Sequence, residues 1–136
     1  MIVSTKGRYA LRVMVCFAQK PEGAYIPLKE IAEAEGISQK YLESIMTVLS
    51  KADFVDAVHG KGGGYRLNRP PEQYTVGSIL KLTEGSLAAV SCTTQGPEAC
   101  GRATCCSTKA MWQKLDNMID EFFEGITLAD LLEENQ

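Results

Sequence analysis

The sequence predicts a mostly α fold with one small β-hairpin, arranged as a winged helix-turn-helix and followed by a long C-terminal helix. Two observations support this. Apolar residues recur at helical spacing in several separate segments. After the first three of these segments come two short apolar runs joined by a glycine-rich turn. With 136 residues, 45% of them hydrophobic and 23% charged, the chain has the size and composition of about one folded domain.

The first half of the chain contains three predicted helices. Ser4 or Thr5 can cap the first, which ends around residues 20–23. Pro27 suits the start of a short helix over residues 28–35, and Gly36 suits its end. Ser38 can cap the third helix. Its predicted inner face consists of Tyr41, Leu42, Ile45, Met46 and Leu49.

The remaining elements follow in order. Residues 54–59 and 65–67 predict the two strands of the hairpin, with a turn over residues 60–64. Thr75 can cap a helix that stops at Gly85. Residues 85 to about 106 show no regular period, and a long helix then runs from Thr108 to Gly125. Residues 127–130 have the spacing of a capping box, with Asp in place of the usual Glu or Gln, and predict a short last helix.

This order of elements indicates a DNA-binding surface. The helix beginning at Ser38 would lie in the major groove, and the glycine-rich wing would lie near a phosphate or the minor groove. Each part also has an ordinary explanation, since helix pairs with glycine turns occur in plain helical cores and an exposed Glu43 can be a solvated charge. The candidate DNA-binding residues are Lys6, Arg8, Ser38, Gln39, Lys40, Tyr41, Glu43, Ser44, His59, Lys61 and Gly62.

Charge is divided unevenly along the chain. Residues 1–69 contain ten Lys/Arg and seven Asp/Glu, a balance of +3, whereas residues 70–136 contain four and ten, a balance of −6. The first half is therefore the one expected to meet a polyanion, although ordinary variation in surface charge would give a similar split.

Several other classes of protein are disfavoured. The glycine-rich turn lacks P-loop spacing, and a single histidine without paired carboxylates gives no constellation for acid–base or nucleophilic catalysis. We therefore expect no enzymatic activity. The absence of a long apolar run and of a signal-peptide pattern leads us to expect a cytoplasmic protein without membrane contact.

Four of the five cysteines fall within fifteen residues: Cys92, Cys100, Cys105 and Cys106. In a cytoplasmic protein such a group indicates metal or redox chemistry more often than a structural disulfide. Cys16 stands apart at a helical position beside an aromatic residue, where a lone cysteine is usually buried packing.

Several motifs together are typical of one family: STKGRYA at residues 4–10, GIS and YLE within residues 36–43, GKGGGY at 60–65, LTEG at 82–85, Trp112, and ITLADL at 126–131. In these motifs the sequence resembles the Rrf-type family of winged-helix regulators, which contains the isc-type iron–sulfur cluster regulator and the cysteine-metabolism repressor of Gram-positive bacteria. The resemblance covers nearly the whole chain.

The resemblance implies a transcription regulator, more often a repressor than an activator. It would bind a near-palindromic double-stranded DNA operator as a homodimer. It also implies three parts: a winged helix-turn-helix domain over residues 1–84, a cysteine-rich sensor loop over 85–107, and a dimerisation helix with a short terminal helix over 108–136. Some members act only with a metabolic-enzyme partner, for which the acidic second half is a candidate docking surface.

The resemblance further implies an iron–sulfur cluster, with [2Fe–2S] as the expected type. Its motif places the ligands on Cys92, Cys100 and Cys106, although the gap between the first two is longer than expected. Lys109 occupies the position where the isc-type regulator has a histidine ligand, and a protonated lysine cannot coordinate a metal. Cys105 is an additional candidate ligand. A thiol–disulfide switch, a zinc site and inert cysteines remain alternatives, although the Cys-x-x-Cys pairs usual for zinc are absent.

Overall fold

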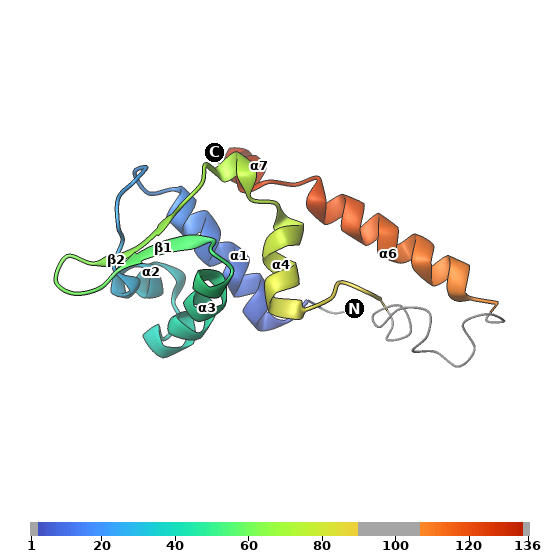
Figure 1. The fold of residues 1–136 in the computed structure, drawn as a ribbon, viewed down its shortest axis with the longest axis horizontal. Helices are drawn as coiled ribbons and strands as arrows, with labels where there is room; N and C mark the ends of the chain where they lie inside the picture. The colour runs from blue at the N-terminus through green and yellow to red at the C-terminus, as the bar shows by residue number, and fades with distance from the viewer. Residues whose placement is uncertain (1–2, 90–106, 135–136) are drawn as a thin grey trace.

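The computed structural model describes residues 3–89 and 107–134. Within these ranges the chain forms the predicted helices and hairpin, together with a short 3-10 turn that the sequence did not predict (Figure 1). The elements are α1 (Thr5–Ala18), α2 (Leu28–Glu35), α3 (Gln39–Lys51), β1 (Val55–Val58), β2 (Gly64–Leu67), η1 (Pro71–Gln73), α4 (Val76–Glu84), α6 (Lys109–Glu124) and α7 (Leu128–Glu134).

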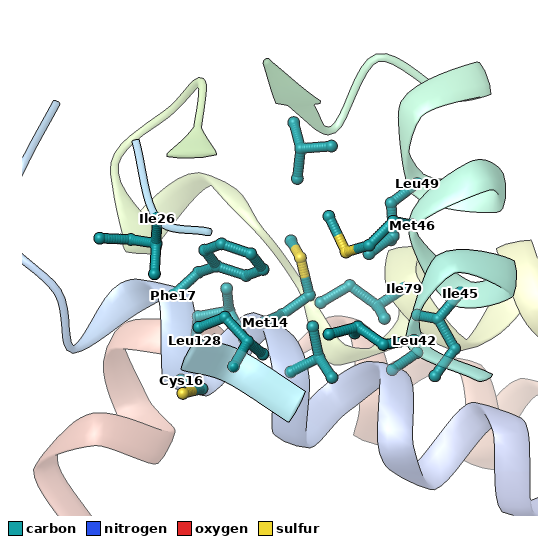
Figure 2. Packing of buried hydrophobic residues seen from close by; sticks show 14 of the residues in the cluster. Met14, Cys16, Phe17, Ile26, Leu42, Ile45, Met46, Leu49, Ile79 and Leu128 are labelled. Atoms are coloured by element: carbon teal, nitrogen blue, oxygen red, sulfur yellow. The ribbon is translucent and has the colours of Figure 1, made fainter. Parts of the chain in front are cut away.

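The main core lies between α1 and α3 and is closed by residues from α2, β1, α4 and α7. Met14 and Phe17 of α1 face Leu42 and Met46 of α3 across this core (Figure 2). These side chains are at most 4% exposed, so each contributes roughly 2 kcal/mol of hydrophobic stabilisation. The core fixes how α3 is held, and so which of its faces meets solvent.

The hairpin is antiparallel, with Val55 opposite Leu67 and Val58 opposite Gly64. Gly64 therefore belongs to β2, one residue earlier than the sequence predicted. The reason is a close approach by the chain before α2, where Ile26 and Tyr65 exchange N–H···O bonds of 2.8 and 2.9 Å. A side chain at position 64 would collide with the Ile26 backbone, so glycine permits a third short segment to join the hairpin.

The last part of the chain packs against the segment that precedes α4 and against the main core. The Val76 N–H donates to the Ile126 carbonyl at 2.8 Å, and the Leu128 N–H donates to the Tyr74 carbonyl at 3.0 Å. Leu128 is fully buried in the main core. These contacts place α7 against α1 at the opposite end of the chain.

Helix α6 projects from the body of the molecule and contacts it along one side only (Figure 1). Ile119 and Phe123 pack on a second small cluster formed by Val76, Leu80 and Leu87. An adjoining side exposes Met111 (54%), Leu115 (37%), Met118 (59%) and Phe122 (63%), which we call the α6 apolar stripe. The predicted apolar side of this helix is thus two faces, only one of which is covered within the described chain.

Candidate nucleic-acid interface

Helices α2 and α3 form the helix-turn-helix because each of their boundary residues has a local physical role. Pro27 precedes α2 in extended conformation, and Gly36 ends it with a left-handed φ of 68°. The Ser38 hydroxyl then accepts the Tyr41 N–H at 3.1 Å and caps α3. Both caps confirm the sequence prediction, and together they set a tight turn between the two helices.

Helix α3 has one buried and one exposed face. Leu42, Ile45, Met46 and Leu49 are completely buried, which fixes the rotation of the helix about its axis. The predicted DNA-binding residues of this element are exposed, except Tyr41, which is half-buried and packs against the main core. They are Ser38, Gln39, Lys40, Tyr41, Glu43 and Ser44.

The first turns of α3 present a mixed set of donors and acceptors. No acidic residue lies in the first turn, so the positive end of the helix is not neutralised there. The Ser44 hydroxyl donates to the Tyr41 carbonyl at 2.6 Å, which leaves only its lone pairs for an outside group. Among the residues that the structure describes, Glu43 has no ion-pair partner and its carboxylate is free to accept.

The wing tip is built from glycines in conformations that other residues rarely adopt. Gly60 and Gly62 have φ of 97° and 80°, and the Gly63 N–H closes the turn on the Gly60 carbonyl at 3.0 Å. His59, Lys61 and Gly62 are exposed there. Within the described ranges Lys61 has no carboxylate partner, so its charge points into solvent unneutralised.

The start of α1 adds a third cationic segment. Arg8 is exposed and Lys6 is half-buried, and the Arg8 guanidinium donates to the Thr5 hydroxyl at 3.4 Å. One residue later, the Tyr9 ring meets the Tyr41 ring edge-on at 5.9 Å between centroids. This contact links the beginning of α1 to the first turn of α3, so the structure brings two of the three predicted DNA-binding segments together.

The sequence did not predict a pair of hydrogen bonds between the start of α1 and the end of α4. Glu84, the last residue of α4, accepts from the Ser4 N–H at 3.1 Å and from the Ser4 hydroxyl at 2.6 Å. The carboxylate fits there because Gly7 has no side chain to block it. The signal was present in the STKG and LTEG motifs, but no local rule connects residues eighty positions apart.

A second network joins α4 to α6. Lys81 forms ion pairs with Asp120 at 2.6 Å and Glu124 at 3.0 Å, and Glu124 also accepts from the Thr75 hydroxyl at 2.8 Å. The hydrogen bonds from Lys81 to the two carboxylates raise its pKa. Further along α6, Asp116 accepts the Ala89 N–H at 2.8 Å. Three carboxylates one turn apart on α6 therefore hold α4 and the segment that follows it.

The predicted metal ligands Cys92, Cys100 and Cys106, with Cys105, lie outside the described residues. Their described neighbours are Ala89, held on Asp116, and Lys109, the first residue of α6. Over residues 3–89 and 107–134 there is no group of three metal-ligating side chains. Cys16 is buried in the main core, and burial, followed by the nearby Glu35 carboxylate, raises the pKa of its thiol.

The fold and this surface define a winged-helix DNA-binding protein. The chain belongs to the Rrf2 family, described as iron-dependent transcriptional regulators, whose match spans residues 3–134. It is therefore a DNA-binding transcription regulator and not an enzyme. Within the described part of the chain, no helix is long and apolar enough to span a membrane.

Individual relatives are similar over the full length of the chain. The transcriptional regulator IscR of Aliivibrio salmonicida is 38% identical over 136 residues, which are all of this chain and 80% of that protein. The solved structure of T. potens IscR matches with a TM-score of 0.79 and 38% identity, covering 100% of this chain and 89% of that one. CymR, the global cysteine regulator of B. subtilis, matches with a TM-score of 0.80 and 30% identity, covering 98% of each chain.

Proposed function

We propose that this chain is a repressor that binds a near-palindromic operator as a homodimer, with its DNA affinity set by an iron–sulfur cluster on the cysteine-rich segment. The observation that carries the DNA-reading part is the two-faced α3. Its inner face is locked into the core, while Gln39, Lys40 and Glu43 stand exposed at its first turns. A recognition helix needs this combination of rigidity and free polar edges.

The exposed residues divide into two chemical roles. Glu43, with no competing cation in the described chain, reads a cytosine amino group, and Lys40 reaches a guanine edge or a phosphate. Arg8 and Lys61 are flexible cations at the two margins of the surface, and they contact phosphates without regard to sequence.

Replacement of Glu43 by Ala should change which bases the protein prefers, because the acceptor for the cytosine amino group is lost. Binding to a library of operator variants measures this preference. An equal loss of affinity at every operator contradicts the base-reading role of Glu43.

The α6 apolar stripe supports the homodimer. Met111, Leu115, Met118 and Phe122 follow one another at spacings of four, three and four residues, the pattern of a helix that packs against another helix. A stripe of this kind is costly to leave in water. A second copy of α6 covers it and places one α3 on each half of a two-fold symmetric operator.

The cluster rests on the chemistry of the donors and on where their segment begins and ends. Four thiols lie within residues 92–106, and thiolates are the ligands that iron–sulfur clusters use. The segment starts from Ala89, held on Asp116, and returns at Lys109, seven residues or roughly 10 Å earlier along the same helix. A chain that leaves and returns on one helix can bring Cys92, Cys100 and Cys106 to a common site. When bound, the cluster supplies a redox- and iron-sensitive group at that site.

The residues around this segment provide a route from its state to the DNA-binding surface. Asp116 holds its first end, and Asp120 and Glu124 hold Lys81 of α4. Glu84, in the same last turn of α4 as Lys81, accepts from Ser4, the cap of α1. A cluster-dependent change that reaches Asp116 through Ala89 would therefore be passed along α6 to α4 and to the cationic start of α1.

The test is purification without oxygen, followed by an absorption spectrum and a count of iron and sulfide per chain. We expect visible absorption bands with matched iron and sulfide, lost in Cys92→Ala, Cys100→Ala and Cys106→Ala. Cys16→Ala is the matched control, because its thiol lies in the main core and its loss leaves the bands in place. Cys105→Ala decides whether that thiol is the fourth ligand.

A colourless protein without iron, even after reconstitution, contradicts the cluster and leaves the DNA-binding role intact. A thiol switch or a partner enzyme would then control the regulator. Equal operator affinity for cluster-loaded and cluster-free protein would contradict the regulatory step alone.

A further inference from the structure

A cavity of about 330 Å³ lies at the base of the wing, between the linker that follows α1 and the segment that follows β2. We call it the wing-base cavity. Phe17, Ala18 and Gly23 line one side, and residues 66–72 other than Asn68 line the other. Its volume is within the range of pockets that bind small organic molecules. None of its lining residues belongs to the exposed face of α3.

Arg69 is the cation in this wall with binding capacity left. Its Nη2 donates to the Asp53 carbonyl at 2.8 Å, and its guanidinium lies over the Phe54 and Tyr74 rings at 4.9 and 5.5 Å from their centroids. In the described chain no carboxylate lies within ion-pair distance of Arg69. A guanidinium has five N–H donors in a fixed plane, so most of them remain for an outside acceptor.

The other cations of the wall already have partners, and its two carboxylates repel ligands of high negative charge. Arg66 is shared between Asp56 at 3.5 Å and the Gly23 carbonyl at 3.1 Å, and Lys20 is paired with Glu30 at 3.0 Å. Glu22 and Glu72 also line the cavity and disfavour a highly charged anion. Phe17, Leu67 and Pro71 add apolar surface. The wall therefore suits one carboxylate attached to a carbon skeleton better than a phosphate.

We propose that the wing-base cavity binds a small organic carboxylate. Its carboxylate pairs with the free edge of Arg69, the geometry that guanidinium and carboxylate favour. Its carbon skeleton lies against Leu67 and Pro71, which are half-buried in this wall.

Such a ligand acts on both DNA-reading elements. Arg69 holds Asp53 in the turn after α3, a residue with a left-handed φ of 59°, and Arg66 holds Asp56 of β1. A carboxylate that draws either guanidinium toward the cavity changes how firmly the end of α3 and the wing are held. Because binding and DNA affinity are then linked, each affects the other by the same factor. This control is independent of the cluster.

The test uses the full chain, free of cluster and DNA, titrated with succinate, benzoate and inorganic phosphate and followed by amide chemical shifts. We expect saturable binding of at least one of the two organic carboxylates, tighter than that of phosphate. The shifts should centre on residues 17–24 and 66–72, with smaller changes at Asp53 and Asp56. In Arg69→Gln the affinity falls by about ten-fold or more, since the charge-assisted bonds are lost.

Arg12→Gln is the matched control, because Arg12 lies outside the cavity in an ion pair with Glu35 at 2.8 Å, and it keeps the affinity unchanged. Ala18→Leu provides a second route if Arg69→Gln unfolds, since it fills part of the cavity and weakens binding while Arg69 stays in place. If neither carboxylate binds with a dissociation constant below about 10 mM, the proposed site is wrong, because the binding free energy would then be under about 3 kcal/mol. An equal loss in Arg12→Gln, or tighter binding of phosphate, overturns it as well.

Discussion

At the scale of single residues, the fold depends on a few positions where one atom decides the local structure. The Ser38 hydroxyl starts α3, and the absence of a side chain at Gly7 makes room for Glu84 beneath α1. Gly64 is a further case, since Ile26 backbone atoms occupy the space where its Cβ would lie. These positions explain why the glycines and caps of the sequence were its most informative residues.

Replacement of Gly64 by Ala should lower the free energy of unfolding by about 3 kcal/mol, because the new methyl group meets backbone that cannot rotate away. Gly36→Ala is the comparison: its φ of 68° is unfavourable for Ala, yet no atom lies within 4 Å, so about 1 kcal/mol is expected. Urea denaturation followed by circular dichroism measures both. A smaller loss for Gly64→Ala than for Gly36→Ala would contradict the close approach of Ile26.

Lys61 at the wing tip tests the phosphate-contacting role. Lys61→Gln should weaken binding to all DNA sequences alike and reduce the slope of log affinity against log salt by about one for each protomer bound. Lys114→Gln on α6 removes the same charge from an exposed position away from the proposed surface. Fluorescence anisotropy over a salt series distinguishes them; an unchanged slope in Lys61→Gln would mean that the wing does not reach a phosphate.

At the scale of elements, capping residues and apolar spacing predicted α1 to α4, the hairpin and α7, because both signals lie within each segment's own sequence. The third segment of the hairpin was missed, since Ile26 lies far from Tyr65 in sequence. The division of α6 into two apolar faces was missed for the same reason. Periodicity marks residues that avoid water, but it does not say whether α4 or another chain covers them.

The exposed face of α6 makes a clear prediction about assembly. Met118→Glu should dissociate the homodimer and weaken operator binding by at least about a hundred-fold, since a charge cannot be buried there without a partner and the second α3 is lost. Gln113→Glu introduces the same charge on the same helix outside the stripe and should leave the dimer intact. Light scattering coupled to gel filtration reports the mass. A monomeric wild-type protein would show that the stripe has another occupant.

At the scale of the whole molecule, function is distributed over two halves of opposite charge. The first half holds the proposed phosphate-contacting cations, while the acidic second half supplies Asp116, Asp120 and Glu124, which hold Ala89 and α4. The net charge of −3 for the whole chain does not reveal this division. Neither half stands alone, because α7 completes the core against α1 and α4 connects the start of α1 to α6.

The same integration predicts how the whole fold responds to alkaline pH. Burial raises the pKa of Cys16 above its ordinary 9.0 and that of Tyr74 above 10.0, and the carboxylates of α6 raise that of Lys81 above 10.5. A folded-state pKa above the unfolded value means that the folded protein holds its proton more tightly. This stabilisation is complete below about pH 9 and is lost as the pH rises through the folded values.

We therefore expect the free energy of unfolding to stay constant up to about pH 9 and then to fall, with the fall continuing above pH 10.5 as each group passes its raised folded pKa. Urea denaturation in the presence of a thiol reductant measures it. Both Cys16→Ala and Tyr74→Phe should lower the free energy of unfolding at pH 8. The first removes core packing. The second removes the 2.7 Å hydrogen bond from the Tyr74 hydroxyl to the Phe54 carbonyl. Each should nevertheless show a shallower decline with pH than the wild type. These three groups come from the main core and from the α4–α6 junction. A decline that is equally steep in both variants would therefore place the alkaline sensitivity outside the main core and leave Lys81, where α4 meets α6, as its source.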